Sequence, residues 1–124
     1  MKIKHQFIKF IDKIFWNSYA YVYDDIAKYY NPYKQLNDFI FNFITSKLKK
    51  GIVFDAGCGT GELAIMLARK YRVIAGDFSP VMINKLNNKI LKNKIKNIST
   101  KIIDLNKKLP FKDKTFDVVV NVHS

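Results

Sequence analysis

The stretch VFDAGCGTGE, residues 53–62, constrains the fold of this chain more than any other part of the sequence. A short apolar run reaches Asp55, and three glycines follow at two-residue spacing, Gly57, Gly59 and Gly61. Glycines in such a turn allow positive φ angles and let the backbone approach a ligand closely. An apolar run of this length between glycines is typical of a buried parallel strand. We therefore expect a strand, a tight turn and a helix in direct succession.

The sequence after this turn alternates between patterns typical of strands and patterns typical of helices. The second helix has a clear start, because Ser79 can act as its N-cap and Pro80 occupies its first position. The expected strands are 52–56, 72–77, 99–104 and 116–122, and the expected helices are 61–70 and 79–95, the latter with an apolar face of Met82, Ile83, Leu86, Ile90 and Leu91. This order predicts an α/β fold with a doubly wound parallel sheet.

The first part of the chain, 1–50, is expected to be helical and to form a segment distinct from the α/β portion, 51–124. Two apolar stripes recur at helical spacing. They are Ile3, Phe7, Phe10, Ile11 and Ile14, and Tyr33, Leu36, Ile40, Phe43 and Ile44. The first stripe lies beside lysines, which is typical of an interfacial helix and would allow a peripheral membrane contact. Packing of this stripe on the α/β portion is the alternative that we favour.

Composition says less about function than the net charge of +12 would suggest. Almost all the cations are lysines, the exceptions being Arg69 and Arg72, and a protein that reads phosphates in a defined geometry more often uses arginine. A nucleic-acid partner is therefore disfavoured. No apolar stretch approaches the ~20 residues that span a bilayer, and no signal-peptide pattern is present. With Cys58 as the single cysteine, we expect a cytoplasmic protein without an internal disulfide bond.

Three carboxylates fall at the carboxyl ends of expected strands, where open α/β sheets bind their ligands. They are Asp55, Asp77 and Asp104. The glycine spacing G-x-G-x-G differs from the dinucleotide pattern G-x-G-x-x-G, and a carboxylate beside it would repel a pyrophosphate. The same carboxylate suits a ligand with an ammonium and a sulfonium group. These residues therefore favour S-adenosylmethionine as the ligand, with its amino-acid end at the turn.

The other two carboxylates suit the adenosine part of such a ligand. Asp77 can accept hydrogen bonds from ribose hydroxyls, a role shared with NAD enzymes, although it could instead help to cap the following helix. Phe78 and Met82 could line the adenine. Asp104 could accept from the exocyclic amine or simply face solvent, and Leu105 could offer a backbone contact.

Taken together, VFDAGCGTGELAIMLA, VIAGDFSPVMI and IIDLNKKLPFKDKTFDVVV resemble a class I S-adenosylmethionine-dependent methyltransferase. The last element most resembles the subgroup that holds quinone, phospholipid and other small-molecule methyltransferases. The resemblance covers roughly residues 19–124. It implies a Rossmann-like fold of seven strands, of which this chain would supply the first four. It also implies a cofactor site made of Asp55, Ala56, Gly57, Cys58, Gly59, Gly61, Asp77, Phe78, Met82, Asp104, Leu105 and Asn121.

The function that follows is methyl transfer to a small-molecule or lipid-like acceptor. The alternatives are an RNA-binding methyltransferase, an NAD-dependent reductase and a non-catalytic remnant. With four of the seven strands, the chain is expected to be a fragment, a truncated reading frame or half of a split protein, and in the last case a complementing C-terminal chain would complete the family fold. No residue is assigned as catalytic: His123 is disfavoured as a base, Cys58 is expected to pack rather than react, and no metal ligands are predicted.

Overall fold

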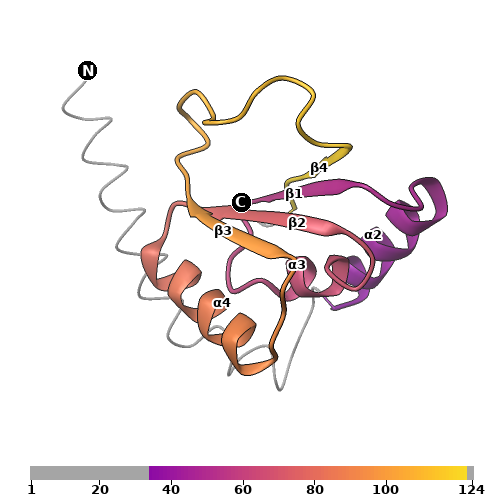
Figure 1. Ribbon diagram of the computed structural model, residues 1–124, viewed down its shortest axis with the longest axis horizontal. Helices are drawn as coiled ribbons and strands as arrows, with labels where there is room; N and C mark the ends of the chain where they lie inside the picture. Colours follow the sequence, from indigo (N-terminus) through magenta and orange to yellow (C-terminus); the bar gives the residue numbers. More distant parts are fainter. Residues whose placement is uncertain (1–33, 123–124) are drawn as a thin grey trace.

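The computed structural model describes residues 34–122, and Figure 1 draws the remaining residues in grey. The expected first helix and both histidines lie outside the described residues. The elements are α2 (Lys34–Lys47), β1 (Ile52–Ala56), α3 (Glu62–Leu67), β2 (Arg72–Asp77), α4 (Pro80–Lys92), β3 (Ile98–Ile102) and β4 (Val118–Val120). The expected alternation of strands and helices after residue 51 is confirmed.

The four strands form one parallel sheet in the order β3-β2-β1-β4. From β1 the chain proceeds outward through β2 to β3, and it then returns to place β4 on the other side of β1 (Figure 1). The strand order therefore reverses beside β1. In open α/β sheets the ligand binds at such a switch point, beyond the carboxyl ends of the strands. The turn after β1 occupies this position.

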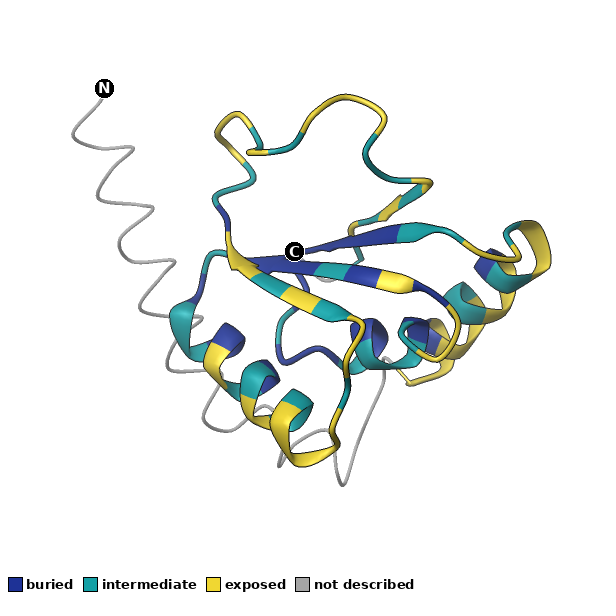
Figure 2. Ribbon diagram, viewed as in Figure 1, coloured by how far each residue is buried: buried dark blue, intermediate teal, exposed yellow. Residues whose placement is uncertain are grey.

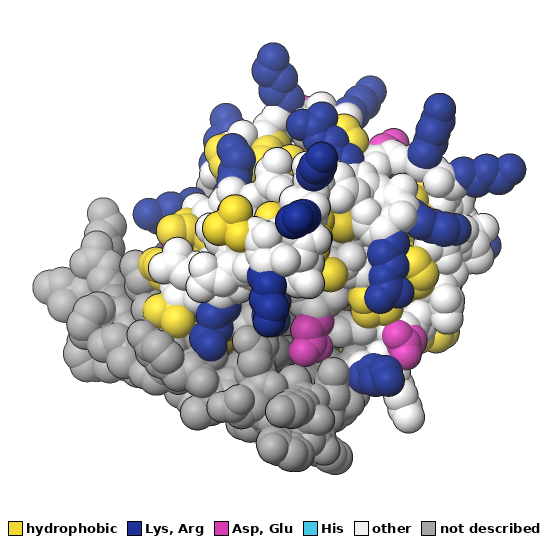
Figure 3. Space-filling view, turned by 60° about the horizontal axis from the view of Figure 1, so that its bottom comes forward, with side chains coloured by type: hydrophobic (Ala, Val, Ile, Leu, Met, Phe, Trp, Pro, Cys, Tyr) yellow, Lys and Arg dark blue, Asp and Glu magenta, His cyan; other side chains and the backbone are white. Residues whose placement is uncertain are grey.

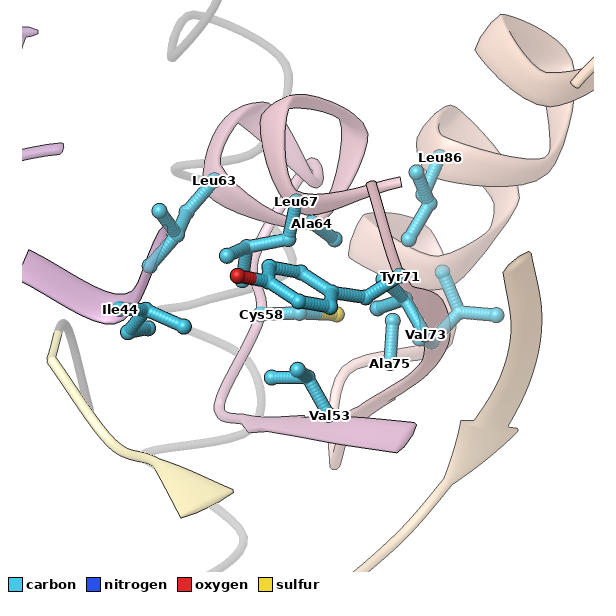
Figure 4. Close-up of a cluster of buried hydrophobic side chains, with 11 residues drawn as sticks. Ile44, Val53, Cys58, Leu63, Ala64, Leu67, Tyr71, Val73, Ala75 and Leu86 are labelled. Atoms are coloured by element: carbon cyan, nitrogen blue, oxygen red, sulfur yellow. The ribbon is translucent and has the colours of Figure 1, made fainter. Parts of the chain in front are cut away.

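The main hydrophobic core lies between the sheet and the helices, which cover one of its faces (Figure 1). Tyr71 lies at the centre of this cluster, 2% exposed, and its hydroxyl donates to the carbonyl oxygen of Leu48 at 2.5 Å (Figure 4). Around it pack Ile44 from α2, Val53 from β1 and Leu67 from α3, each almost completely buried. The same core thus joins α2 to the α/β portion.

The opposite face of the sheet is covered by the long segment between β3 and β4 (Figure 1). Phe111 and Phe116 of this segment pack against Phe54 of β1, with ring centroids 5.2 and 4.9 Å from that of Phe54. Most of the segment is nevertheless exposed or half-buried (Figure 2). Its aromatic side chains fix it to the sheet through this second, smaller cluster.

The predicted start of α4 is confirmed, and several predicted ends are not. The Met82 N–H donates to Ser79 Oγ at 3.3 Å, and Pro80 opens the helix. The helix expected at 61–70 is shorter, since α3 is Glu62–Leu67. Beyond α3, the N–H groups of Arg69 and Lys70 donate to carbonyl oxygens three residues earlier, as in a 3₁₀ turn, which is tighter than an α-helix. The third strand is Ile98–Ile102 and the fourth only Val118–Val120.

The predicted apolar faces of the helices are only partly buried. On α2, Ile44 is in the core, but Leu36 and Phe43 are 41% and 56% exposed and Asn37 is buried instead. On α4, Leu91 is 77% exposed. Helix α2 has apolar residues on two sides, and within residues 34–122 the side of Ile44 packs into the main hydrophobic core. Periodicity alone does not distinguish these two sides.

Candidate functional site

The turn after β1 is a glycine loop held against the end of β2. Gly57, Gly59 and Gly61 have φ angles of 73°, 58° and 90°. These values lie in the left-handed region, where a side chain is unfavourable. The N–H groups of Gly57 and Cys58 both donate to the carbonyl oxygen of Gly76, at 2.8 and 2.9 Å. The backbone of the turn is therefore fixed relative to two adjacent strands.

Two of these glycines serve different purposes. A Cβ atom at Gly61 would lie 2.2 Å from Leu86 Cδ1, so the absence of a side chain lets α3 begin directly against α4. A Cβ atom at Gly59 would have no heavy atom within 4 Å. Gly59 therefore faces open space at the carboxyl ends of the strands, and space of this kind beside a turn backbone is what a ligand would fill.

Asp77, the last residue of β2, links this turn to the start of α4. Its Oδ2 accepts from the Gly59 N–H and its Oδ1 from the Ser79 N–H, both at 2.9 Å. The side chain is 8% exposed. Burial raises the pKa of Asp77, while N–H donation from Ser79, Gly59 and Phe78 opposes that rise. Asp77 thus supports the loop and caps the turn into α4, whatever else it binds.

Asp55 is the second buried carboxyl group at this end of the sheet. It lies one residue before the end of β1 and is 3% exposed. Its Oδ2 is buried and, among the described residues, has no hydrogen-bond partner. Burial, with a smaller contribution from the negative charge of Asp77, raises the pKa of Asp55 to about 7. A buried carboxyl oxygen without a donor is uncommon in folded proteins, so Asp55 is a candidate contact for a ligand that carries a hydrogen-bond donor.

Ala56 and Cys58 are buried beside these groups, at 4% and 7% exposure. Cys58 belongs to the main hydrophobic cluster, which agrees with its expected role in packing. Burial, followed by the negative charges of Asp55 and Asp77, raises the pKa of the Cys58 thiol far above its ordinary value. The thiol therefore stays protonated at neutral pH and is a poor nucleophile.

The expected adenine residues follow the ends of β2 and β3. Phe78 is half-buried, while Met82 in the first turn of α4 is 3% exposed. The Ile103 N–H donates to the carbonyl oxygen of Asp77 at 2.9 Å, which places Asp104, the next residue, at the same end of the sheet. Asp104 Oδ1 accepts from the Asn106 N–H at 2.9 Å.

Two further expected residues lie at the edges of this region. Leu105 packs against the cluster of Phe54 on the face of the sheet away from the helices. Asn121 is exposed and directly follows β4, whose Val120 pairs with Asp55. All twelve expected residues thus lie near the carboxyl ends of the strands, in the last two residues of a strand, in the segments that follow, or, for Met82, in the first turn of α4.

Gly76 was not among the expected site residues, although it organises the turn. Its carbonyl oxygen receives the two N–H groups described above, and a Cβ atom on it would lie 2.9 Å from Ile103 Cδ1 and 3.1 Å from Phe54 Cε1. A glycine inside a strand pattern often marks such a close approach of neighbouring groups. That signal was present in the sequence RVIAGD.

Among residues 34–122, no group of three or more His, Cys, Asp or Glu side chains is arranged to hold a metal ion. Within the same range, no helix is both long and apolar enough to cross a membrane.

These features define a Rossmann-like α/β domain with a buried acid before its glycine turn, and comparison with known proteins identifies the family. Residues 53–124 match the methyltransferase domain family. The chain belongs to this family, which confirms the resemblance to class I methyltransferases. Comparison with curated protein sequences gave no match.

Solved structures agree with this assignment. A proposed S-adenosyl-L-methionine-dependent methyltransferase from Methanococcus maripaludis matches with a TM-score of 0.75 and 25% identity over 87% of this chain and 50% of its own. Magnesium protoporphyrin IX methyltransferase from Synechocystis, solved with bound S-adenosylhomocysteine, matches with a TM-score of 0.61 and 27% identity over 70% of this chain and 40% of its own. A dimethyladenosine transferase from Plasmodium falciparum matches with a TM-score of 0.61 and 26% identity over 72% of this chain and 31% of its own.

This chain therefore spans half, or less than half, of the length of these structures. The family match, residues 53–124, includes the glycine turn. The acceptors named for the two matching enzymes differ in chemistry, so the shared fold does not identify the acceptor.

Proposed function

We propose that this chain binds S-adenosylmethionine at the carboxyl ends of β1, β2 and β3, and that it forms the cofactor-binding part of a methyltransferase. The observation that carries the proposal is the buried Oδ2 of Asp55, which lacks a hydrogen-bond donor and lies before a turn with open space at Gly59. A ligand with an ammonium group would supply the donor and compensate the charge. A pyrophosphate would do neither.

In this proposal the amino-acid end of the cofactor lies on the turn, against Asp55, Gly57 and Gly59. Asp77 binds the ribose through lone pairs that its two N–H partners leave available, since each carboxylate oxygen can accept more than one hydrogen bond. The other expected contacts keep their proposed places: Ala56, Cys58 and Gly61 at the turn, Phe78, Met82, Asp104 and Leu105 around the adenine, and Asn121 beside β4. The bound cofactor supplies the methyl group on its sulfonium, and these residues bind and orient it.

The proposed acceptor is a small or lipid-like molecule. The segment LPFKDKTFDVVV supports this acceptor class, because it resembles the subgroup of quinone, phospholipid and other small-molecule methyltransferases. Phe111 and Phe116 hold this segment to the sheet. In Figure 3 the Lys and Arg side chains are scattered over the visible surface rather than gathered in one stripe. A scattered charge is weak support for a nucleic-acid acceptor, which a basic groove or stripe would favour.

The complete reaction is proposed to require more protein than residues 34–122. In the described sheet β4 pairs with β1 alone, and Val119 on this edge strand is 58% exposed. We propose that further strands, in a longer form of this protein or in a complementing chain, cover this edge and complete the acceptor site. We also propose a cytoplasmic location and, if the basic segment at the N-terminus forms the helix expected from its sequence, a peripheral membrane contact through it.

Isothermal titration calorimetry with S-adenosylhomocysteine tests the cofactor proposal, with NAD⁺ as the matched ligand that shares an adenosine. We expect binding of S-adenosylhomocysteine and none of NAD⁺ at the same concentration. Equal binding of both ligands would indicate a general adenosine site. No binding to a chain that circular dichroism shows to be folded would refute the proposal.

The acceptor is tested by methyl transfer from tritiated S-adenosylmethionine to separated lipid, RNA and small-molecule fractions. The chain is assayed with and without the added C-terminal strands of a matching methyltransferase. Label in the lipid or small-molecule fraction is the expected result. Label confined to RNA would favour the RNA-binding alternative.

A further inference from the structure

The two buried carboxyl groups at the end of the sheet are not equivalent. Asp77 receives N–H donors on both of its oxygens, whereas Asp55 Oδ2 receives none from the described residues. Hydrogen bonds from N–H groups stabilise the ionised form of a carboxyl group, and burial without them favours the neutral form. Of two neighbouring buried carboxyl groups, usually one is ionised while the other keeps its proton. Here the hydrogen bonds favour the negative charge on Asp77 and the proton on Asp55.

Among residues 34–122, the groups around Asp55 supply no positive charge. Its strand neighbours Ala75 and Val120 are uncharged, and Cys58 carries a thiol that remains protonated. Asp77 is the one charged group among the described residues that shifts the pKa of Asp55, and it does so upward. The resulting pKa of about 7 agrees with a proton on Asp55 near neutrality.

We propose that Asp55 holds a proton in the ligand-free chain and releases it to solvent when the ammonium group of the cofactor binds; this inference rests on the function proposed above. Asp55 would thereby select ligands that bring a positive charge to this end of the site. The O–H bond of the carboxyl group breaks, the proton passes to the buffer, and the ammonium group keeps its own protons. The new carboxylate then accepts a hydrogen bond from the ammonium group.

This exchange makes the affinity for the cofactor depend on pH. Above pH 8 the carboxyl group is already ionised, and binding costs no deprotonation. Below pH 7 the proton must first leave, so the dissociation constant rises about tenfold between pH 8 and pH 6. A ligand without the ammonium group gains nothing from the carboxylate and shows no such dependence.

Proton release is measured directly by calorimetry in phosphate and in imidazole, which both buffer near neutrality and whose ionisation enthalpies differ, at pH 6, 7 and 8. The probe is S-adenosylhomocysteine, and the control is 5′-methylthioadenosine, which keeps the adenosine but lacks the α-amino and α-carboxyl groups. We expect release of about 0.9, 0.5 and 0.1 proton at the three pH values for the probe. We expect none for the control ligand. An Asp55→Asn chain, whose amide resembles the neutral acid in shape, should release none with either ligand and lose the pH dependence.

The outcomes separate this inference from the function on which it rests. S-adenosylhomocysteine that binds the unaltered chain without releasing a proton, or releases as much from the Asp55→Asn chain, would overturn the inference and leave the cofactor proposal intact. Binding of neither nucleoside to the folded chain would overturn both. The measurement on the unaltered chain is decisive even if the Asp55→Asn chain fails to fold.

Discussion

Gly59 and Gly61 differ by two positions in the same turn, yet a methyl group should act differently at each. Gly59→Ala places its methyl in open space, so we expect a loss of stability of only about 1 kcal/mol from the left-handed backbone, with a large loss of S-adenosylhomocysteine affinity. Gly61→Ala drives its methyl into Leu86 and should cost about 2–4 kcal/mol of stability. Urea unfolding and calorimetry measure the two effects. A Gly59→Ala chain that binds as well as the unaltered chain would contradict the assignment of that space to the ligand.

The stability of the ligand-free chain should depend on the protonation of Asp55. Its pKa is about 7 in the folded chain, against an ordinary value of 3.8. Because the folded pKa is the higher one, the folded state holds a proton between about pH 4 and 7 that the unfolded state has lost. The protonation of Asp55 therefore contributes most to the free energy of unfolding below pH 4. This contribution falls as pH rises to 7, by an amount on the order of 4 kcal/mol.

Asp55→Asn removes this dependence. The variant should be nearly as stable as the unaltered chain at pH 4 and more stable by on the order of 2–4 kcal/mol at pH 8. Urea unfolding of both chains at the two pH values gives the comparison. If the Asp55→Asn chain and the unaltered chain differ in free energy of unfolding by the same amount at pH 4 and at pH 8, Asp55 does not change its protonation between these pH values.

At this scale the sequence predicted where the two acids lie in the fold, but not their hydrogen-bond contacts. The strand-end positions of Asp55 and Asp77 followed from the apolar runs before them. The two N–H bonds that Asp77 accepts, and the missing donor at Asp55, depend on how two turns pack together. Spacing along the chain does not specify such packing, so the asymmetry between the two acids appears only in three dimensions.

Helix α2 shows how one element can present two apolar sides of different importance. Ile44 is 5% exposed within the main core, while Phe43 beside it is 56% exposed. We expect Ile44→Ala to cost about 2–4 kcal/mol of stability and Phe43→Ala less than about 1 kcal/mol. Urea unfolding of the two single variants tests this. Equal losses would mean that Phe43 also packs in solution.

The strands and the start of α4 were predictable because their signals are local. Ser79 and Pro80 mark a helix start through their own side chains. The ends of α3 and β4 were placed wrongly, since α3 closes into a tighter turn and β4 pairs with β1 over only three residues. Such ends depend on neighbouring elements rather than on the residues themselves.

At the scale of the whole molecule, the topology brings the site together. The order β3-β2-β1-β4 places the turn after β1 at the switch point, and the segment from β3 to β4 covers the face that the helices leave open (Figure 1). The alternation of elements was enough to predict a parallel sheet of this kind. Its acceptor site was not predictable, since the matching structures extend well beyond the shared part.

The central claim is that the turn after β1 and the end of β2 bind the cofactor. It is tested most directly by amide chemical-shift mapping of the ¹⁵N-labelled chain during titration with S-adenosylhomocysteine. We predict that the largest shifts fall on residues 55–61, 77–82 and 103–105, with little change along the exposed side of α2. Shifts centred elsewhere, or no shifts at all in a folded chain, would contradict the claim.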